Sequence, residues 1–222
     1  MATSVLIADD SPYIRTAYRR ILETQDDLEV SAVVDDGRAA VEAAEGISVD
    51  VAILDVRMPR LDGITAGKKI REASPSTSLV IVSAFDDWTY IQDLVSTDPG
   101  GKAYILKNSL DDIGELIRVV RQVLKGYVIF DHTLVDKLVG YYERHTSPEA
   151  REFSRDHLSV ISLYSRGFEK SEMRPMLEIS SDQLDQRLSD VFTHLGIDQS
   201  DEQGNQVATT ISFLNRCVAL DA

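Results

Sequence analysis

Residues 51–63 have the sequence Val-Ala-Ile-Leu-Asp-Val-Arg-Met-Pro-Arg-Leu-Asp-Gly. The first four residues are an apolar run that predicts a buried β-strand, and Asp55 ends this run. Pro59 and the pair Asp62-Gly63 indicate a turn, and residues 64–73 then return to a helical pattern. A strand, a charged strand end, a turn and a helix in this order are typical of one unit of an alternating α/β chain.

Four further apolar runs repeat this order of strand and helix. We expect strands over residues 4–8, 29–34, 79–82 and 103–106, with helices over 12–22, 37–45, 88–96 and 113–124. Ser11 and Pro12 suit the N-cap and first position of a helix, and Ser109–Asp112 suits an acidic capping box. Five apolar strands, each followed by a helix, predict an α/β fold: a five-stranded, parallel, doubly wound sheet covered on both faces.

Polar side chains stand where these strands end. Asp9 and Asp10 follow the first strand, Asp55 the third, Ser83 the fourth and Lys107 the fifth. In open parallel sheets, ligands bind outside the carboxyl ends of the strands. Carboxylates suit Mg²⁺, and a lysine and a hydroxyl suit a phosphoryl group. Each aspartate alone could be a helix cap or turn residue, but the set together predicts a phosphoryl-transfer site.

Residues 1–125 resemble the receiver domain of bacterial response regulators. The motifs are the pair Asp9-Asp10, Asp55 within Leu-Asp-Val-Arg-Met-Pro, Asp62-Gly63, Ser83-Ala84 and Lys107 after Tyr-Ile-Leu. The resemblance implies that Asp55 accepts a phosphoryl group from a cognate histidine kinase or a small phosphodonor. It assigns Mg²⁺ to Asp9, Asp10, Asp55 and the backbone carbonyl of Arg57. It also assigns the phosphate-contacting lysine to Lys107 and the switch hydroxyl to Ser83.

The same resemblance allows an interpretation of one further residue and one segment. Tyr104 matches the aromatic residue that turns inward on activation, although an isolated tyrosine can equally be a half-buried strand residue. The segment between Ser83 and Lys107 is longer than is usual in the family, with the additional residues around Thr97–Gly101. The proline and glycines there are expected to alter the fourth helix and its return loop, and with them the signalling route.

The remainder of the chain divides into a linker and a helical domain. Residues 126–152 lack the sheet pattern and are expected to form the linker. Residues 153–222 predict a small all-α domain with a helix-turn-helix arrangement, in which Ser180-Ser-Asp-Gln183 caps the second helix of the motif. The apolar positions of 153–196 resemble the LuxR-type output domain. The resemblance implies transcription regulation and DNA binding through Gln183, Gln186, Arg187 and His194.

The charge of this domain disagrees with that implication. The whole chain has a formal net charge of −14, and residues 146–222 carry 7 Lys and Arg against 13 Asp and Glu. DNA-binding domains usually present a basic surface, because phosphate neutralisation supplies much of their affinity. Three interpretations stay open: weak DNA binding, DNA binding as half of a heterodimer, or a protein-interaction module that does not bind DNA.

Several expectations concern the whole protein. A narrow apolar stripe at Val207, Ile211, Leu214 and Val218 belongs either to the domain core or, as the resemblance implies, to a homodimer interface. No apolar run is long enough for a membrane span, and the N-terminus lacks the features of a signal peptide, so we expect a cytoplasmic protein with no membrane partner. The protein is not expected to be an enzyme, apart from assisting the phosphorylation and dephosphorylation of Asp55. A metal-dependent phosphatase is a third hypothesis.

Overall fold

The computed structural model describes all residues except 1, 87, 96–99, 111–112, 199–200 and 220–222. The chain divides into two compact units, residues 1–126 and 127–222. Among the described residues, no helix is both long and apolar enough to cross a bilayer. The prediction for residues 97–101 falls largely on undescribed positions, and so do the two aspartates of the predicted capping box at 109–112.

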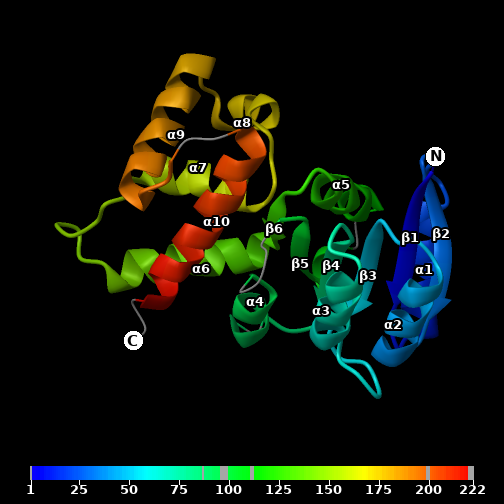
Figure 1. Cartoon of the computed structure of the whole chain (residues 1–222). Coiled ribbons are helices and arrows are strands. Elements are labelled where there is room, and N and C mark those ends of the chain that lie inside the picture. The colour runs from blue at the N-terminus through cyan, green and yellow to red at the C-terminus, as the bar shows by residue number, and fades with distance from the viewer. Residues whose placement is uncertain (1, 87, 96–99, 111–112, 199–200, 220–222) are drawn as a thin grey trace. The chain divides into compact units, whose positions relative to one another are not determined.

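The first unit is built on a parallel sheet (Figure 1). Its strands are β1 (Thr3–Ala8), β2 (Leu28–Val34), β3 (Val51–Asp55), β4 (Ser78–Ser83) and β5 (Lys102–Leu106). The order β2-β1-β3-β4-β5 brings the ends of β1 and β3 side by side, with Ala8 opposite Leu54. All residues of β3, β4 and β5 are buried, as expected for strands covered on both faces.

Helices cover both faces of this sheet, which confirms the doubly wound prediction. They are α1 (Pro12–Leu22), α2 (Gly37–Gly46), α3 (Gly63–Ala73), α4 (Trp88–Val95) and α5 (Ile113–Leu124), and a short 3₁₀ turn spans Lys107–Ser109. Helix α1 packs against α5 on one face, and α3 packs against α2 and α4 on the other. Pro12 stands at the start of α1, where its missing N–H is not needed.

The prediction of five strands was wrong by one. The described residues include a sixth strand, β6 (Val128–Phe130), which lies at the start of the second unit and within the segment expected to be a linker. Its three residues are too few for a periodic signal. The amide of Gln206 stabilises this strand: its Oε1 accepts the Val128 N–H at 3.1 Å and its Nε2 donates to the Val128 carbonyl at 2.6 Å.

In the described part of the second unit, every regular element other than β6 is a helix. Its helices are α6 (His132–His145), α7 (Arg155–Ser165), α8 (Lys170–Leu177), α9 (Ser181–Leu195) and α10 (Glu202–Ala219). The capping box at Ser180 is present, with the Ser180 hydroxyl accepting the Gln183 N–H and the Gln183 side chain accepting the Ser180 N–H. Helix α6 packs on α7 and α10, so residues of the expected linker form part of this helical unit.

Helix α10 does not bury the stripe expected from its sequence. Of that stripe only Leu214 is buried, and Val207, Ile211 and Val218 are half-buried. The buried face is largely polar and consists of Asn205, Gln206, Thr209, Thr210, Phe213, Leu214 and Cys217. Gln206 also donates to the Tyr164 carbonyl at 2.7 Å, and hydrogen bonds of this kind let a polar face occupy a core. Burial raises the pKa of the Cys217 thiol to about 12.

Candidate functional site

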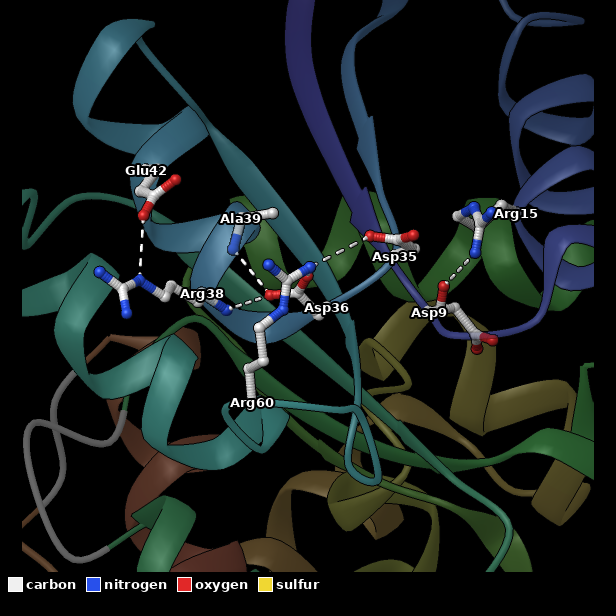
Figure 2. Close-up of polar contacts among 8 residues, drawn as sticks. All are labelled: Asp9, Arg15, Asp35, Asp36, Arg38, Ala39, Glu42 and Arg60. Carbon is white, nitrogen blue, oxygen red and sulfur yellow. Dashed lines mark hydrogen bonds and ion pairs between the residues drawn. The ribbon is translucent and has the colours of Figure 1, made fainter.

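The acidic pair at the end of β1 supplies one buried and one exposed carboxylate. Asp9 is 1% exposed, and its Oδ1 accepts the Ser11 N–H at 2.8 Å. Arg15 on α1 donates to the Asp9 backbone carbonyl at 2.6 Å, which fixes the strand end to the following helix (Figure 2). Asp10 is exposed. The turn into α1 therefore holds one carboxylate rigidly and leaves its neighbour open to solvent.

Asp55 at the end of β3 is buried against the start of α3. It is 5% exposed, and Gly63 packs so tightly on it that a Cβ there would lie 2.1 Å from the Asp55 carbonyl oxygen. The side chain of Asp62 caps α3 by accepting the Thr65 N–H at 2.9 Å. The Asp62-Gly63 pair therefore brings α3 directly against the backbone of Asp55.

Lys107 joins these two strand ends. Its Nζ lies 2.8 Å from Oδ2 of Asp9 and 3.2 Å from Oδ1 of Asp55. The 3₁₀ turn begins at this lysine, immediately after β5. The structure thus brings together Asp9, Asp55 and Lys107 as the sequence predicted, from strand ends that lie at one edge of the sheet.

The charges of this cluster shift the pKa values of two groups. Burial raises the pKa of the Asp55 carboxyl above its usual 3.8; Lys107 offsets part of this increase, and Asp9 and Asp10 add to it. Burial lowers the pKa of Lys107, but the contacts with Asp9 and Asp55 outweigh burial and hold it above 10.5. At neutral pH Lys107 is therefore a fixed cation among carboxylates that repel one another.

The donor set fits a divalent cation with a preference for oxygen. Among the described residues, Asp9, Asp10 and Asp55 form the one group of acidic, histidine or cysteine side chains whose ligand atoms all lie within 4.8 Å of one another. Oδ2 of Asp9 is buried beside the ammonium of Lys107. Carboxylate oxygens with room for water suit Mg²⁺ rather than zinc.

Ser83 and Tyr104 meet at the backbone of Phe85. Ser83 Oγ accepts the Phe85 N–H at 3.0 Å, and the fully buried Tyr104 donates from its hydroxyl to the Phe85 carbonyl at 2.9 Å. Tyr104 therefore points inward. The ring of Phe85 is 47% exposed and lies 3.9 Å from the guanidinium carbon of Arg57. Sequence reasoning missed Phe85, since nothing in the pattern marks it.

Comparison with known proteins agrees with this geometry. Residues 5–121 match the family model described as the response regulator receiver domain. The oxygen regulatory protein NreC of Staphylococcus aureus is 30% identical over 206 residues, which cover 89% of this chain and 93% of NreC. The chain is a response regulator. Its function is that of the family, phosphorylation-dependent control of transcription, with a LuxR-type output domain.

Two solved structures are also similar. The crystal structure of a DNA-binding response regulator of the LuxR family from Staphylococcus aureus has 30% identity and a TM-score of 0.50, covering 55% of this chain and 98% of that one. The RcsB response regulator of Salmonella typhimurium has 20% identity and a TM-score of 0.54, covering 99% of this chain and 100% of that one. The second likeness shows that both units of the fold are shared.

The candidate DNA-contacting residues of this response regulator lie on α9, and each engages another part of the same unit. Arg187 pairs with Asp156 of α7 at 2.6 Å, and Gln186 donates to Asp190 at 2.8 Å. Gln183 is part of the capping box, and a ring nitrogen of His194 lies 2.6 Å from the Asp190 carbonyl oxygen. The structure therefore places all four on one helix, and each has at least one polar partner within the unit.

The acidic residues of α9 are also partly neutralised. Lys170 of α8 pairs with Asp185 at 2.8 Å, while Asp182 stays exposed. A domain of formal charge −6 over residues 146–222 thus uses the side chains of Lys170 and Arg187 within its own fold. Cations held in this way carry less attraction toward phosphates.

Proposed function

We propose that Asp55 is the phosphoacceptor of this response regulator. The observation that supports this is the position of Lys107 between Asp9 and Asp55, because a buried carboxylate beside a fixed lysine and two further carboxylates suits phosphoryl transfer. The donor would be a cognate histidine kinase or a small phosphodonor. A cytoplasmic location forms part of the same proposal.

Each residue at the strand ends has a role in this proposal. An oxygen of Asp55 attacks phosphorus, forming an acyl phosphate as the donor group leaves. Asp9, Asp10 and Asp55, with the Arg57 backbone carbonyl, would hold Mg²⁺, which neutralises charge on the transferred group when bound. Lys107 contacts one phosphate oxygen. The Ser83 hydroxyl donates a hydrogen bond to a second phosphate oxygen and gives up the bond that it now accepts from the Phe85 N–H.

The inward Tyr104 links this event to the rest of the protein. Because Ser83 and Tyr104 both bond the backbone of Phe85, movement of Ser83 toward a phosphoryl group would shift this loop. The same residues assist the return reaction, in which water attacks the acyl phosphate. Catalytic hydrolysis of an external phosphate ester by this protein would instead favour the hypothesis of a metal-dependent phosphatase.

We propose that the output domain acts on transcription as a homodimer that binds DNA weakly through α9. The LuxR-type fold supports DNA binding, while the internal ion pairs of Arg187 and Lys170 support low affinity. A specific alternative is that this domain binds another protein instead, which the exposed Asp182 and the negative charge of the domain favour. Titration of labelled promoter DNA at low salt, with and without phosphodonor, separates these possibilities.

A phosphorylation assay tests the central claim. The protein is incubated with a labelled small phosphodonor and Mg²⁺, and hydroxylamine is then added to cleave acyl phosphates. Asp55→Asn should remove all hydroxylamine-sensitive label, whereas Asp26→Asn, which changes an exposed aspartate in the same unit, should retain it. Persistent labelling of the Asp55→Asn protein would disprove the assignment.

A further inference from the structure

The loop that follows Asp55, residues 56–62, is fixed at both ends by backbone hydrogen bonds. The Val56 N–H donates to the Val82 carbonyl at 2.9 Å, and the Gly63 N–H donates to the Val56 carbonyl at 3.0 Å. Within the loop, the Leu61 N–H donates to the Pro59 carbonyl at 2.7 Å and closes a tight turn. The backbone of Arg57, the fourth proposed magnesium ligand, lies within this loop.

Arg60 adopts a backbone conformation that residues with side chains usually avoid. Its φ angle is +63°, in the left-handed region that favours glycine. Its guanidinium forms an ion pair with Oδ2 of Asp36 and lies 3.9 Å from Oδ1 of Asp35 (Figure 2). An unfavourable conformation persists where surrounding contacts fix it, so this ion pair is part of what holds the loop.

Asp36 uses both carboxylate oxygens to join this loop to α2. It is 1% exposed, and its Oδ1 accepts the N–H groups of Arg38 and Ala39, which caps the helix (Figure 2). The next residue, Gly37, touches the loop directly, since a Cβ there would lie 2.2 Å from the Leu61 carbonyl oxygen. The first turn of α2 is therefore docked on the loop, and Oδ2 of Asp36 connects to the strained Arg60.

We propose that Asp36 and Arg60 are positioning residues for the magnesium site, holding loop 56–62 so that the Arg57 carbonyl faces the ion beside Asp55. This inference rests on the proposed function. Mg²⁺ demands near-ideal octahedral geometry at short distances, so a displaced carbonyl ligand weakens binding. Outer residues that orient ligands commonly contribute about tenfold or more to metal affinity.

Two substitutions test the proposal, and the sign of the Arg60→Gly effect distinguishes positioning from simple electrostatics. Arg60→Gly removes a positive charge, which by Coulomb attraction alone would strengthen Mg²⁺ binding, and glycine suits the positive φ. Asp36→Asn removes a negative charge, which alone would weaken binding, while asparagine still caps α2. Positioning predicts weaker binding in both variants. The charge-matched controls are Arg38→Ala and Glu42→Gln, which separate an exposed pair on α2.

Calorimetric Mg²⁺ titration and amide hydrogen exchange of residues 56–62 in the full-length protein provide the readouts. We expect each variant to lower Mg²⁺ affinity by about tenfold, the double variant to lose little more, and exchange to rise in the metal-free protein. Tighter binding by Arg60→Gly, or unchanged exchange in both variants, would overturn the proposal. The proposed function would survive either of these results provided that wild-type protein binds Mg²⁺ and the Asp10→Ala protein does not. If wild-type protein binds no Mg²⁺, the positioning role and the proposed function are both overturned.

Discussion

The hydroxyl of Tyr104 donates a 2.9 Å hydrogen bond to the backbone carbonyl of Phe85. Tyr104 is fully buried, so this bond connects the interior of β5 to the loop after β4. The position of that loop is therefore coupled to a side chain that cannot move without opening a space in the core.

Removal of this hydroxyl should loosen the loop without stopping phosphorylation. Tyr104→Phe retains the ring but leaves the Phe85 carbonyl without this donor, so we expect a loss of about 1 kcal/mol in the free energy of unfolding. Hydrogen exchange at residues 84–86 should rise, while labelling of Asp55 continues. Tyr13→Phe, at a tyrosine 85% exposed, serves as the control and should change neither quantity. Unchanged exchange in Tyr104→Phe would contradict the coupling.

Loss of the Asp55 charge should stabilise the receiver unit at neutral pH. The pKa of this carboxyl is raised in the fold above 3.8, so the folded state binds more protons than the unfolded state between the two values. Stability therefore falls as pH rises through that window, and the full penalty is present above it. Asp55→Asn should melt higher than wild type at pH 7, by about 2–4 °C for each kcal/mol relieved.

Thermal melts of both proteins from pH 4 to pH 8, without Mg²⁺, check this expectation. The advantage of Asp55→Asn should shrink as the pH falls through the raised pKa of Asp55, because the wild-type carboxyl then becomes protonated. Asp26→Asn should show no such trend. An advantage that grows on acidification would mean that the fold lowers the pKa of Asp55 instead of raising it.

Removal of the Lys107 cation should make stability depend strongly on Mg²⁺. Lys107→Gln leaves Asp9 and Asp55 without the ammonium that lies within 3.2 Å of each. Without metal we expect a lower melting temperature, and with millimolar Mg²⁺ a larger recovery than in wild type, because the metal then supplies the missing positive charge. Labelling of Asp55 should slow markedly. Lys125→Gln, an exposed lysine of the same unit, is the control, and equal Mg²⁺ responses in all three proteins would refute the prediction.

A charge reversal on α9 tests the electrostatic limit on DNA binding. Asp185→Lys replaces an acid that pairs with Lys170 and raises the net charge of α9 by two. Affinity for duplex DNA should rise, and the slope of log K against log salt should steepen by about 0.9 for each new phosphate contact. Fluorescence anisotropy at salt concentrations between about 50 and 200 mM measures both.

Glu149→Lys supplies the matched control for this measurement, since it makes the same charge change at an exposed site outside α9. It should have a smaller effect than Asp185→Lys. Equal gains in the two variants would show a general charge effect and would count against contact through α9.

Gln206 should contribute strongly to the stability of the second unit. Its side chain bonds the backbone of Val128 and the carbonyl of Tyr164 while itself fully buried. Gln206→Leu would remove both bonds to Val128 and leave the Tyr164 carbonyl with the Gly167 N–H as its donor. We expect a loss of about 2–4 kcal/mol in the free energy of unfolding. Urea denaturation measures this loss. Gln186→Ala, on the exposed side of α9, should lose less than about 0.5 kcal/mol, and a similar loss in both would contradict the role of Gln206.

The elements of the receiver that could be predicted from the sequence are those that local sequence patterns indicate. Apolar runs indicated β1, β3, β4 and β5, and strand polarity then brought Asp9, Asp55 and Lys107 together without any further information. The ion pair of Asp36 with Arg60 could not be predicted in this way. It depends on a positive φ at Arg60 and on a contact between loops that leave no periodic signal.

The second unit shows the opposite limit of pattern reasoning. A stripe of Val207, Ile211, Leu214 and Val218 suggested which face of α10 is buried, yet of these only Leu214 is buried, and Gln206 and Thr210 lie inside. Polar residues can occupy a core when hydrogen bonds satisfy them. Gln206 donates to Thr210 one turn along the helix, but its partners at Val128 and Tyr164 are far away in sequence. Strand β6 was missed because its three residues are too few for a periodic signal.

The buried thiol of Cys217 makes the chain convenient for site-directed labelling. This is the single cysteine of the sequence, and its pKa of about 12 keeps it protonated at neutral pH, where alkylating reagents need the thiolate. A cysteine introduced on the surface would therefore be the preferred attachment point for a fluorophore or spin label in the otherwise natural protein. Pairs of such probes could report directly on how phosphorylation changes the distance between the two units.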